Sequence, residues 1–212
     1  MPGTWGGMAI AEAITGKFSP AGRLPLALPR SAGHGPVFHG EHAGSTGESF
    51  AAGALNREGY MFTSNSALRP FGYGLSYTAF SYSGFALSIR PDGFGEASVT
   101  VCNVGETDSD EVVQLYGRDV VASVVRPAME LIGVCRVPLA AGQSKTVHFS
   151  FHLNQLAFPD EYGLWKLEPG LFRFFVGGHS ADIRAEAVYT LENERIIEPS
   201  GRDFFAEASV TE

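Results

Sequence analysis

The chain has 212 residues, of which 44% are hydrophobic and 18% are charged, and its formal net charge is −8. This composition excludes an intrinsically disordered chain and suits one large β domain, or one domain with a fragment of another. Nucleic acid and anionic membranes are poor partners, because both require a positive surface and the sequence has no basic run. A neutral ligand such as a sugar remains compatible with this charge.

We expect neither a membrane segment nor a bound metal or cofactor. No stretch reaches the roughly 18 apolar residues that cross a bilayer, and residues 1–16 lack the positive region of a signal peptide. We therefore expect a soluble chain and leave its localisation open. Cys102 and Cys135 lie in strand-like runs without the spacing of a zinc site. Two buried free thiols are expected, and a disulfide between them is the alternative.

The first part of the chain predicts one short helix followed by irregular structure. Residues 7–16, GMAIAEAITG, place apolar side chains at helical spacing and end at a glycine, a common helix stop. The prolines of residues 17–36 forbid a continuous helix or a central strand, so an edge strand or an extended segment is expected. Residues 40–65 are rich in Gly, Ser, Ala and Thr without a regular period, which predicts a long loop.

From about residue 83 onward, short β-like runs alternate with turn residues, which is the pattern of an antiparallel sandwich. Residues 145–153, KTVHFSFHL, show it most clearly, because Val147, Phe149 and Phe151 share one face. About eight such runs fit two packed sheets. They are residues 85–91, 97–105, 111–120, 129–139, 145–153, 164–169, 171–178 and 183–191. Residues 204–210 are a further strand candidate, either at a sheet edge or on the surface.

Five strings together resemble one known family. They are GKFSPAGRLPLALPRSAG (16–33), RPFGYGLSYTAF (69–80), NVGETDSDEVVQLYGRD (103–119), RPAMELIGVCRVPLAAGQSKTVHF (126–149) and EPGLFRFFVGGHSADI (168–183). In this order and spacing they resemble the C-terminal half of family 3 glycoside hydrolases, the β-glucosidase and β-xylosidase family. In that family a barrel domain is followed by an α/β sandwich domain and, in many members, by a fibronectin type III-like domain.

The resemblance implies four segments. Residues 1–30 correspond to a remnant of the α/β sandwich domain, 31–75 to a connector loop, 76–192 to the fibronectin type III-like β-sandwich and 193–212 to a C-terminal tail. The predicted fold class is therefore mainly β: a fibronectin type III-like (immunoglobulin-like) antiparallel β-sandwich with a short N-terminal helix and an extended connector.

The resemblance carries no catalytic residue onto this chain. In the family the nucleophile is an Asp of the barrel, and the acid/base residue lies in an earlier part of the α/β sandwich domain or in a loop before it. The chain's own candidates are His39, Glu41, His42 and Glu48, two imidazoles and two carboxylates within ten residues. Such a set could bind a divalent metal or act as acid and base. The common explanation for such residues in a Gly-rich loop is a solvated surface, because a flexible loop positions no side chain for catalysis.

Three aromatic residues are candidates for stacking on a sugar ring: Trp5, Tyr60 and Trp165. Trp165 lies in a strand-like run, where core or edge packing is the more common role, and Trp5 belongs to the segment that resembles the α/β domain. The acidic turn GETDSDE at 105–111 lacks the spaced ligands of a calcium loop and is expected to be a solvated hairpin. Arg23 and Arg126 are expected to form structural ion pairs.

Three functions remain open. The first is the C-terminal scaffold portion of a β-glycosidase, whose parent enzyme hydrolyses terminal β-D-glycosides while this chain is inactive alone. The second is an independent carbohydrate-binding or interaction module. The third is a stand-alone glycoside hydrolase with a new site in the 39–60 connector. The expected partners are a β-glycoside or oligosaccharide and the barrel and α/β domains of a parent enzyme, or a second copy through residues 1–30, because exposed apolar surface tends to associate.

Overall fold

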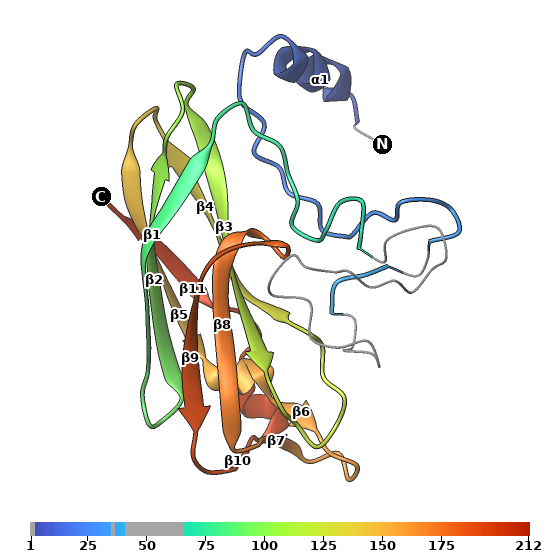
Figure 1. The fold of residues 1–212 in the computed structure, drawn as a ribbon, viewed down its shortest axis with the longest axis vertical. Helices are drawn as coiled ribbons and strands as arrows, with labels where there is room; N and C mark the ends of the chain where they lie inside the picture. Colours follow the sequence, from blue (N-terminus) through green and yellow to red (C-terminus); the bar gives the residue numbers. More distant parts are fainter. Residues whose placement is uncertain (1–2, 35–36, 41–65) are drawn as a thin grey trace.

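The computed structural model describes residues 3–34, 37–40 and 66–212. One helix, α1 (Gly6–Ile14), stands away from a β-sandwich, and extended chain joins the two (Figure 1). The mainly β, fibronectin type III-like architecture predicted from the sequence is confirmed. Within the described ranges, no helix is long and apolar enough to span a membrane.

Two four-stranded antiparallel sheets form the sandwich, and a small third sheet lies at its lower end in Figure 1. The first sheet has the order β1 (Phe80–Ile89), β2 (Phe94–Asn103), β5 (Ser144–His152), β11 (Glu207–Thr211). The second has the order β4 (Glu130–Leu139), β3 (Ser109–Asp119), β8 (Gly170–His179), β9 (Asp182–Leu191). The third joins β10 (Arg195–Ile196), β7 (Trp165–Leu167) and β6 (Phe158–Pro159). The 3-10 helices η1 (Leu153–Leu156) and η2 (Pro199–Gly201) lie between strands.

The main core lies between the two large sheets, because the apolar residues of each strand recur with period two and face inward. The alternation predicted for residues 145–153 is confirmed, since Val147, Phe149 and Phe151 are all buried. The strand candidate near the C-terminus is confirmed as β11, which pairs with β5 at the edge of the first sheet.

Strand β3 departs from this alternation, because it is buried along both faces. Its outer face forms a second, smaller core of Tyr116, Met129 and Phe175, against which Phe71 and Ile183 pack. Phe71 belongs to the chain that precedes the sandwich, so the outer face of the second sheet is covered by the connector. Because the connector covers this outer face, nearly every residue of β3 is buried.

In its described residues, 17–34, the proline-rich segment forms no regular strand. Leu24 and Tyr73 are joined by a backbone hydrogen bond from the Leu24 amide to the Tyr73 carbonyl at 2.9 Å, and Leu28 forms an isolated antiparallel bridge with Arg69. The prolines that flank these contacts lack an amide hydrogen, so a longer ladder cannot form. The result is two extended segments that lie side by side (Figure 1).

Asp119 is a buried carboxylate at the lower end of β3. It is 5% exposed, and neither of its oxygens has a hydrogen-bond partner among the described residues. Burial raises the pKa of Asp119 from 3.8 to about 6, against the opposing influences of the Arg126 guanidinium and of the Val121 amide. A buried carboxylate without partners opposes folding when it is ionised.

The substitution Asp119→Asn is expected to stabilise the fold at neutral pH. Because the folded-state pKa of Asp119 lies above the unfolded-state value, its contribution to the free energy of unfolding falls as pH rises through about 4 to 6. The Asn side chain does not ionise, so the variant should be more stable than the parent chain by roughly 2–3 kcal/mol at pH 7.5. Urea unfolding should show that the free energies of unfolding of the parent chain and of Asp119→Asn become equal near pH 4. A variant no more stable than the parent at pH 7.5 would contradict the assignment.

Candidate functional site

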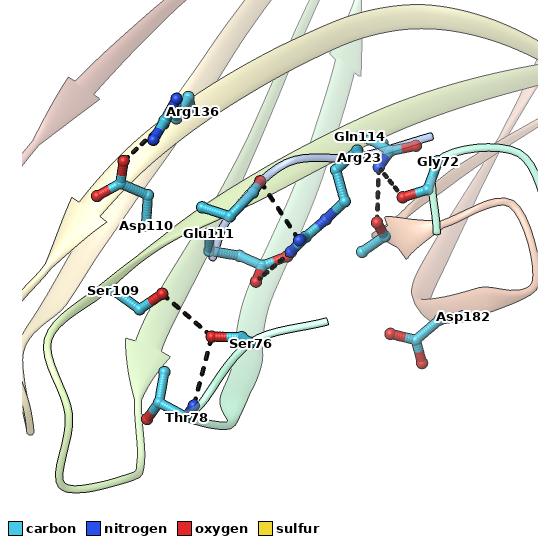
Figure 2. Close-up of polar contacts among 12 residues, drawn as sticks. Arg23, Gly72, Ser76, Thr78, Ser109, Asp110, Glu111, Gln114, Arg136 and Asp182 are labelled. Carbon is cyan, nitrogen blue, oxygen red and sulfur yellow. Dashed lines mark hydrogen bonds and ion pairs between the residues drawn. The ribbon is translucent and has the colours of Figure 1, made fainter. Parts of the chain in front are cut away.

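The candidate functional site is the connector dock, which we define as the surface of the second sheet and its upper end where residues 19–28 and 66–78 pack. At its centre, Arg23 Nη2 donates to Glu111 Oε2 at 2.9 Å (Figure 2). The Tyr82 hydroxyl donates to the other carboxylate oxygen, Glu111 Oε1, at 3.0 Å. Glu111 is 3% exposed. Separating this buried ion pair would leave an unpaired charge inside the protein, which is strongly destabilising. The pair therefore fixes the position of the N-terminal segment.

Burial dominates the electrostatics of this pair. It raises the pKa of Glu111, and Arg23 opposes the shift. The pKa of Tyr82 is also raised, first by burial and then by the neighbouring Glu111 charge. Tyr82 therefore remains a neutral hydrogen-bond donor. The structural ion pairs expected for Arg23 and Arg126 are confirmed, and Arg126 pairs with Glu130 at 2.7 Å.

The prediction of a solvated acidic hairpin at 105–111 is wrong for Glu111, because the N-terminal segment covers it. Asp110 keeps a more exposed place and pairs with Arg136 at 2.5 Å (Figure 2). Asp108 accepts a hydrogen bond from the Ala141 amide at 2.8 Å. In the part of the chain that the structure describes, no group of three or more His, Cys, Asp or Glu residues is arranged to hold a metal ion.

Hydroxyl groups link three segments beside the ion pair. The hydroxyl of Ser76 lies 3.0 Å from that of Ser19 and 3.1 Å from that of Ser109, while Ser19 Oγ accepts from the Tyr77 amide at 3.0 Å. Ser76 and its partner Ser109 are drawn in Figure 2. The N-terminal segment, the connector and β3 thus share one chain of hydrogen bonds.

Gln114 binds the connector further along β3. Its Nε2 donates to the Gly72 carbonyl at 3.2 Å and to the Gly178 carbonyl at 2.6 Å, and its Oε1 accepts from the Tyr116 hydroxyl at 2.5 Å. Gly72 has a φ of 79°, and a Cβ there would come within 2.1 Å of Gln114 Oε1. The glycine of the string PFGYG is therefore required by both its backbone conformation and the closeness of Gln114.

His39 packs as an aromatic side chain in the dock. Its ring stacks on Phe71 with centroids 4.2 Å apart and meets Tyr116 edge-on at 5.6 Å. Burial lowers the pKa of His39 to about 4, so the ring is neutral at pH 7. The other acid and base candidates, Glu41, His42 and Glu48, and the stacking candidate Tyr60 lie outside the described residues.

The two tryptophan candidates occupy different environments. Trp165 in β7 packs partly against the main core, and the Arg202 guanidinium lies 4.4 Å from its ring centroid. One face of this ring is therefore already occupied. Trp5 is 73% exposed at the start of α1. Cys102 and Cys135 are free thiols and are half-buried rather than fully buried.

Helix α1 presents an apolar surface to solvent. Its only buried residue is Gly6, whereas Met8 is 53%, Ile10 52% and Ile14 76% exposed. The Tyr77 hydroxyl donates to the Ala13 carbonyl at 2.8 Å, which links the helix to the docked connector. Helices of soluble domains normally bury such a stripe against another element, so this face is suited to a partner.

The sequence alone missed the roles of Glu111, Tyr82 and Gln114. One signal was present: residues 111–117, EVVQLYG, contain no regular alternation of apolar and polar residues. A run of this kind indicates burial on both faces of a strand, and its polar members then require partners.

Comparison with known proteins agrees with this architecture. Residues 111–180 match the model of the fibronectin type III-like domain. The chain is 39% identical to a periplasmic β-glucosidase of Salmonella typhimurium over 86% of its own length and 24% of that protein. It is 38% identical to a β-xylosidase of Formosa agariphila over 84% of its own length and 25% of that protein.

Solved structures give the same result. A β-glucosidase of Listeria innocua in complex with glucose matches with a TM-score of 0.82 and 30% identity, over 91% of this chain and 27% of that one. A family 3 β-glucosidase of Bifidobacterium adolescentis matches with a TM-score of 0.72 and 30% identity, over 88% and 28% of the two chains. The chain thus spans about a quarter of the length of these relatives. It corresponds to the C-terminal portion of a family 3 glycoside hydrolase of the β-glucosidase and β-xylosidase type, with a fibronectin type III-like domain.

Proposed function

We propose that this chain is the scaffold portion of a β-glycosidase and that it presents α1 and the connector to the catalytic domains of that enzyme. The observation that carries the proposal is the exposed apolar face of α1. Burying Met8, Ile10 and Ile14 against a partner contributes roughly 1.5–3 kcal/mol per fully buried side chain. A hydrogen bond from the Tyr77 hydroxyl to the Ala13 carbonyl ties the helix to the docked chain, which supports a positioning role.

In this proposal the chain is inactive by itself. Retaining hydrolysis of a terminal β-D-glycoside needs two carboxyl groups about 5–5.5 Å apart across the scissile bond. The buried carboxylate of the dock, Glu111, is engaged by Arg23 and Tyr82 and serves to hold the connector. The related enzymes are several times longer than this chain, which supports placing the reaction in their remaining parts.

A chimera tests the scaffold role directly. The aligned residues of the Salmonella typhimurium β-glucosidase are replaced by this chain, and hydrolysis of an aryl β-glucoside is measured for the chimera and for the chain alone. We expect activity from the chimera and none from the chain. Activity of the purified chain would overturn the proposal, and so would a chimera that folds with a complete interface but has no activity.

The face of α1 is tested in the same chimera. Ile10→Glu with Ile14→Glu should lower its free energy of unfolding by roughly 3–6 kcal/mol, because two buried apolar side chains become charged. The matched control is Val188→Glu on β9, which replaces an exposed valine, 58% exposed, remote from the helix. If urea unfolding shows that the helix variant and the control variant lower the free energy of unfolding equally, the catalytic domains do not cover α1.

The chain on its own is expected to self-associate through residues 1–30, because the apolar face of α1 then lacks the catalytic domains as a partner. Sedimentation velocity over a hundredfold range of concentration should show reversible association. Ile14→Glu should shift the equilibrium toward monomer, whereas Val188→Glu should leave it unchanged. A parent chain that stays monomeric throughout would refute this expectation.

Loss of the dock should release the N-terminal segment. Glu111→Ala removes the acceptor of both Arg23 and Tyr82 and should lower the free energy of unfolding by roughly 3–5 kcal/mol. The neighbouring substitution Asp110→Ala breaks only a more exposed ion pair and should cost less than about 1 kcal/mol. Hydrogen exchange locates the effect, since the Leu24 and Gly72 amides, bonded in the dock, should lose protection only in Glu111→Ala. Retained protection of both amides in that variant would contradict the assigned role.

A further inference from the structure

Strand β3 carries a buried carboxylate at each end of its inward face. Residues 111, 113, 115, 117 and 119 share this face, because side chains alternate along a strand. Glu111 at the upper end accepts hydrogen bonds from Arg23 and Tyr82. Asp119 at the lower end is similarly buried, yet its oxygens make no hydrogen bond of normal geometry among the described residues, although the Val121 amide approaches them. The two buried carboxylates of this strand therefore differ in their hydrogen bonding: that of Glu111 is bonded within the described chain, and that of Asp119 is not.

Asp119 belongs to a group of side chains from three separate segments. We call this group the basal cluster and define it as Asp119, Arg126, Gln155 and Arg202. Arg126 Nη2 donates to the Leu156 carbonyl at 2.8 Å, and Arg202 Nη2 donates to the Gln155 carbonyl at 2.9 Å. Arg126 also influences the ionisation of both Asp119 and Arg202. These contacts place the loop after β3, η1 and the chain after η2 together at the lower end of the sandwich.

The basal cluster holds six buried polar atoms without a partner in the described part of the chain. Three are nitrogen atoms that donate hydrogen bonds: Arg126 Nε, Gln155 Nε2 and Arg202 Nε. Three are acceptors: both oxygens of Asp119 and Oε1 of Gln155. Native proteins satisfy most buried polar groups, so six in one place require a common explanation. A hydroxyl group donates and accepts at the same time, and several hydroxyl groups on one molecule match this balanced set.

The charges of this region favour a neutral ligand. Arg126 is already paired with Glu130, and its guanidinium lies over the Phe158 ring at 4.6 Å. Arg202 is placed over the rings of Trp165 and Phe204, at 4.4 and 4.9 Å. Sugar hydroxyl and C–H groups bind to aromatic rings and to carboxylate, amide and guanidinium groups. A simple anion would be repelled by the carboxylate of Asp119, and a simple cation by the guanidinium groups of Arg126 and Arg202.

A cavity of about 380 Å³ adjoins the cluster and is lined by residues 118–128. This volume lies in the range of small-molecule sites. The loop that lines it is held by Ser123, whose amide and hydroxyl donate to the Glu168 carboxylate at 2.7 and 2.6 Å. Val121 and Val125 of the loop are 73% and 65% exposed. Since the unpartnered atoms are covered, a ligand reaches them only when this loop moves.

We propose that the basal cluster and the adjoining cavity bind one neutral sugar unit, whose hydroxyl groups supply the partners that Asp119, Gln155 and Arg126 lack. The unit is either a free monosaccharide or the end of an oligosaccharide, because both present the same hydroxyl groups. The inference does not depend on the proposed scaffold function, since it concerns the opposite end of the sandwich from the connector dock.

The test is an NMR titration of the full chain labelled with ¹⁵N. D-glucose, D-xylose and cellobiose are added separately, and amide shifts are followed. We expect saturable shifts in residues 118–128 and 153–156. Monosaccharides and cellobiose should bind alike if one free unit suffices, whereas tighter binding of cellobiose would identify a chain end as the ligand.

Variants assign the binding to the cluster. Asp119→Asn and Gln155→Ala should each raise the Kd about tenfold. Asp119→Asn replaces a charged acceptor of hydroxyl groups with a weaker neutral amide, and Gln155→Ala removes an amide that both donates and accepts. The matched control is Glu96→Ala, which removes an exposed carboxylate of β2 and should leave the Kd unchanged. Asp119→Asn keeps the shape of the side chain and removes a buried charge, so it is expected to fold.

Three results would overturn the proposal. The first is the absence of saturable shifts with all three sugars, in which case the cluster holds water only. The second is saturable shifts that map away from residues 118–128 and 153–156. The third is binding to which Asp119→Asn and Gln155→Ala make no difference. None of these results bears on the chimera experiment, so the two proposals fail separately.

Discussion

The buried pair of Arg23 and Glu111 is the contact on which the arrangement of the rest depends. It joins a segment that precedes the sandwich to the strand at the centre of the second sheet, and both charges lie out of water. Without the N-terminal segment, the buried carboxylate of Glu111 would lack its charged partner, Arg23. On the opposite, outer face of the same strand, Phe71 of the connector packs against Tyr116 in the second core. The sandwich and the connector are therefore one packed unit.

Strands, helix and family could be predicted from the sequence, whereas the long-range partners of buried polar groups could not. The strands were predictable because the runs around Val147 and Phe149 alternate, and the short helix because its apolar residues recur at helical spacing. The family was predictable from five ordered strings. The partners of Glu111 were not, since Arg23 is 88 positions away in the chain and nothing local in GETDSDE distinguishes a buried carboxylate from solvated ones. Pairings of this kind are fixed by the tertiary fold.

The same limit applies to Asp119, which follows the apolar strand as an ordinary turn residue would. Its burial results from η1 and the loop 120–128 closing over the lower end of the sandwich. The two ends of β3 show that burial of a carboxylate has no single outcome. One end gains a guanidinium and a phenol from elsewhere in the chain, and the other retains unmet hydrogen-bonding capacity. Such a difference is only visible once the contacts of both ends are known.

The separation of Gly72 from Leu24 has a consequence for how this region can vary. These residues hydrogen-bond across a stretch of nearly fifty positions, and the entropy of closing such a loop rises only slowly with its length. Doubling the intervening chain costs about 0.6 kcal/mol, which is small beside a buried ion pair. Insertions between the two docked segments therefore barely weaken the dock. The connector is free to change in length and composition while its two ends stay anchored to the same sheet.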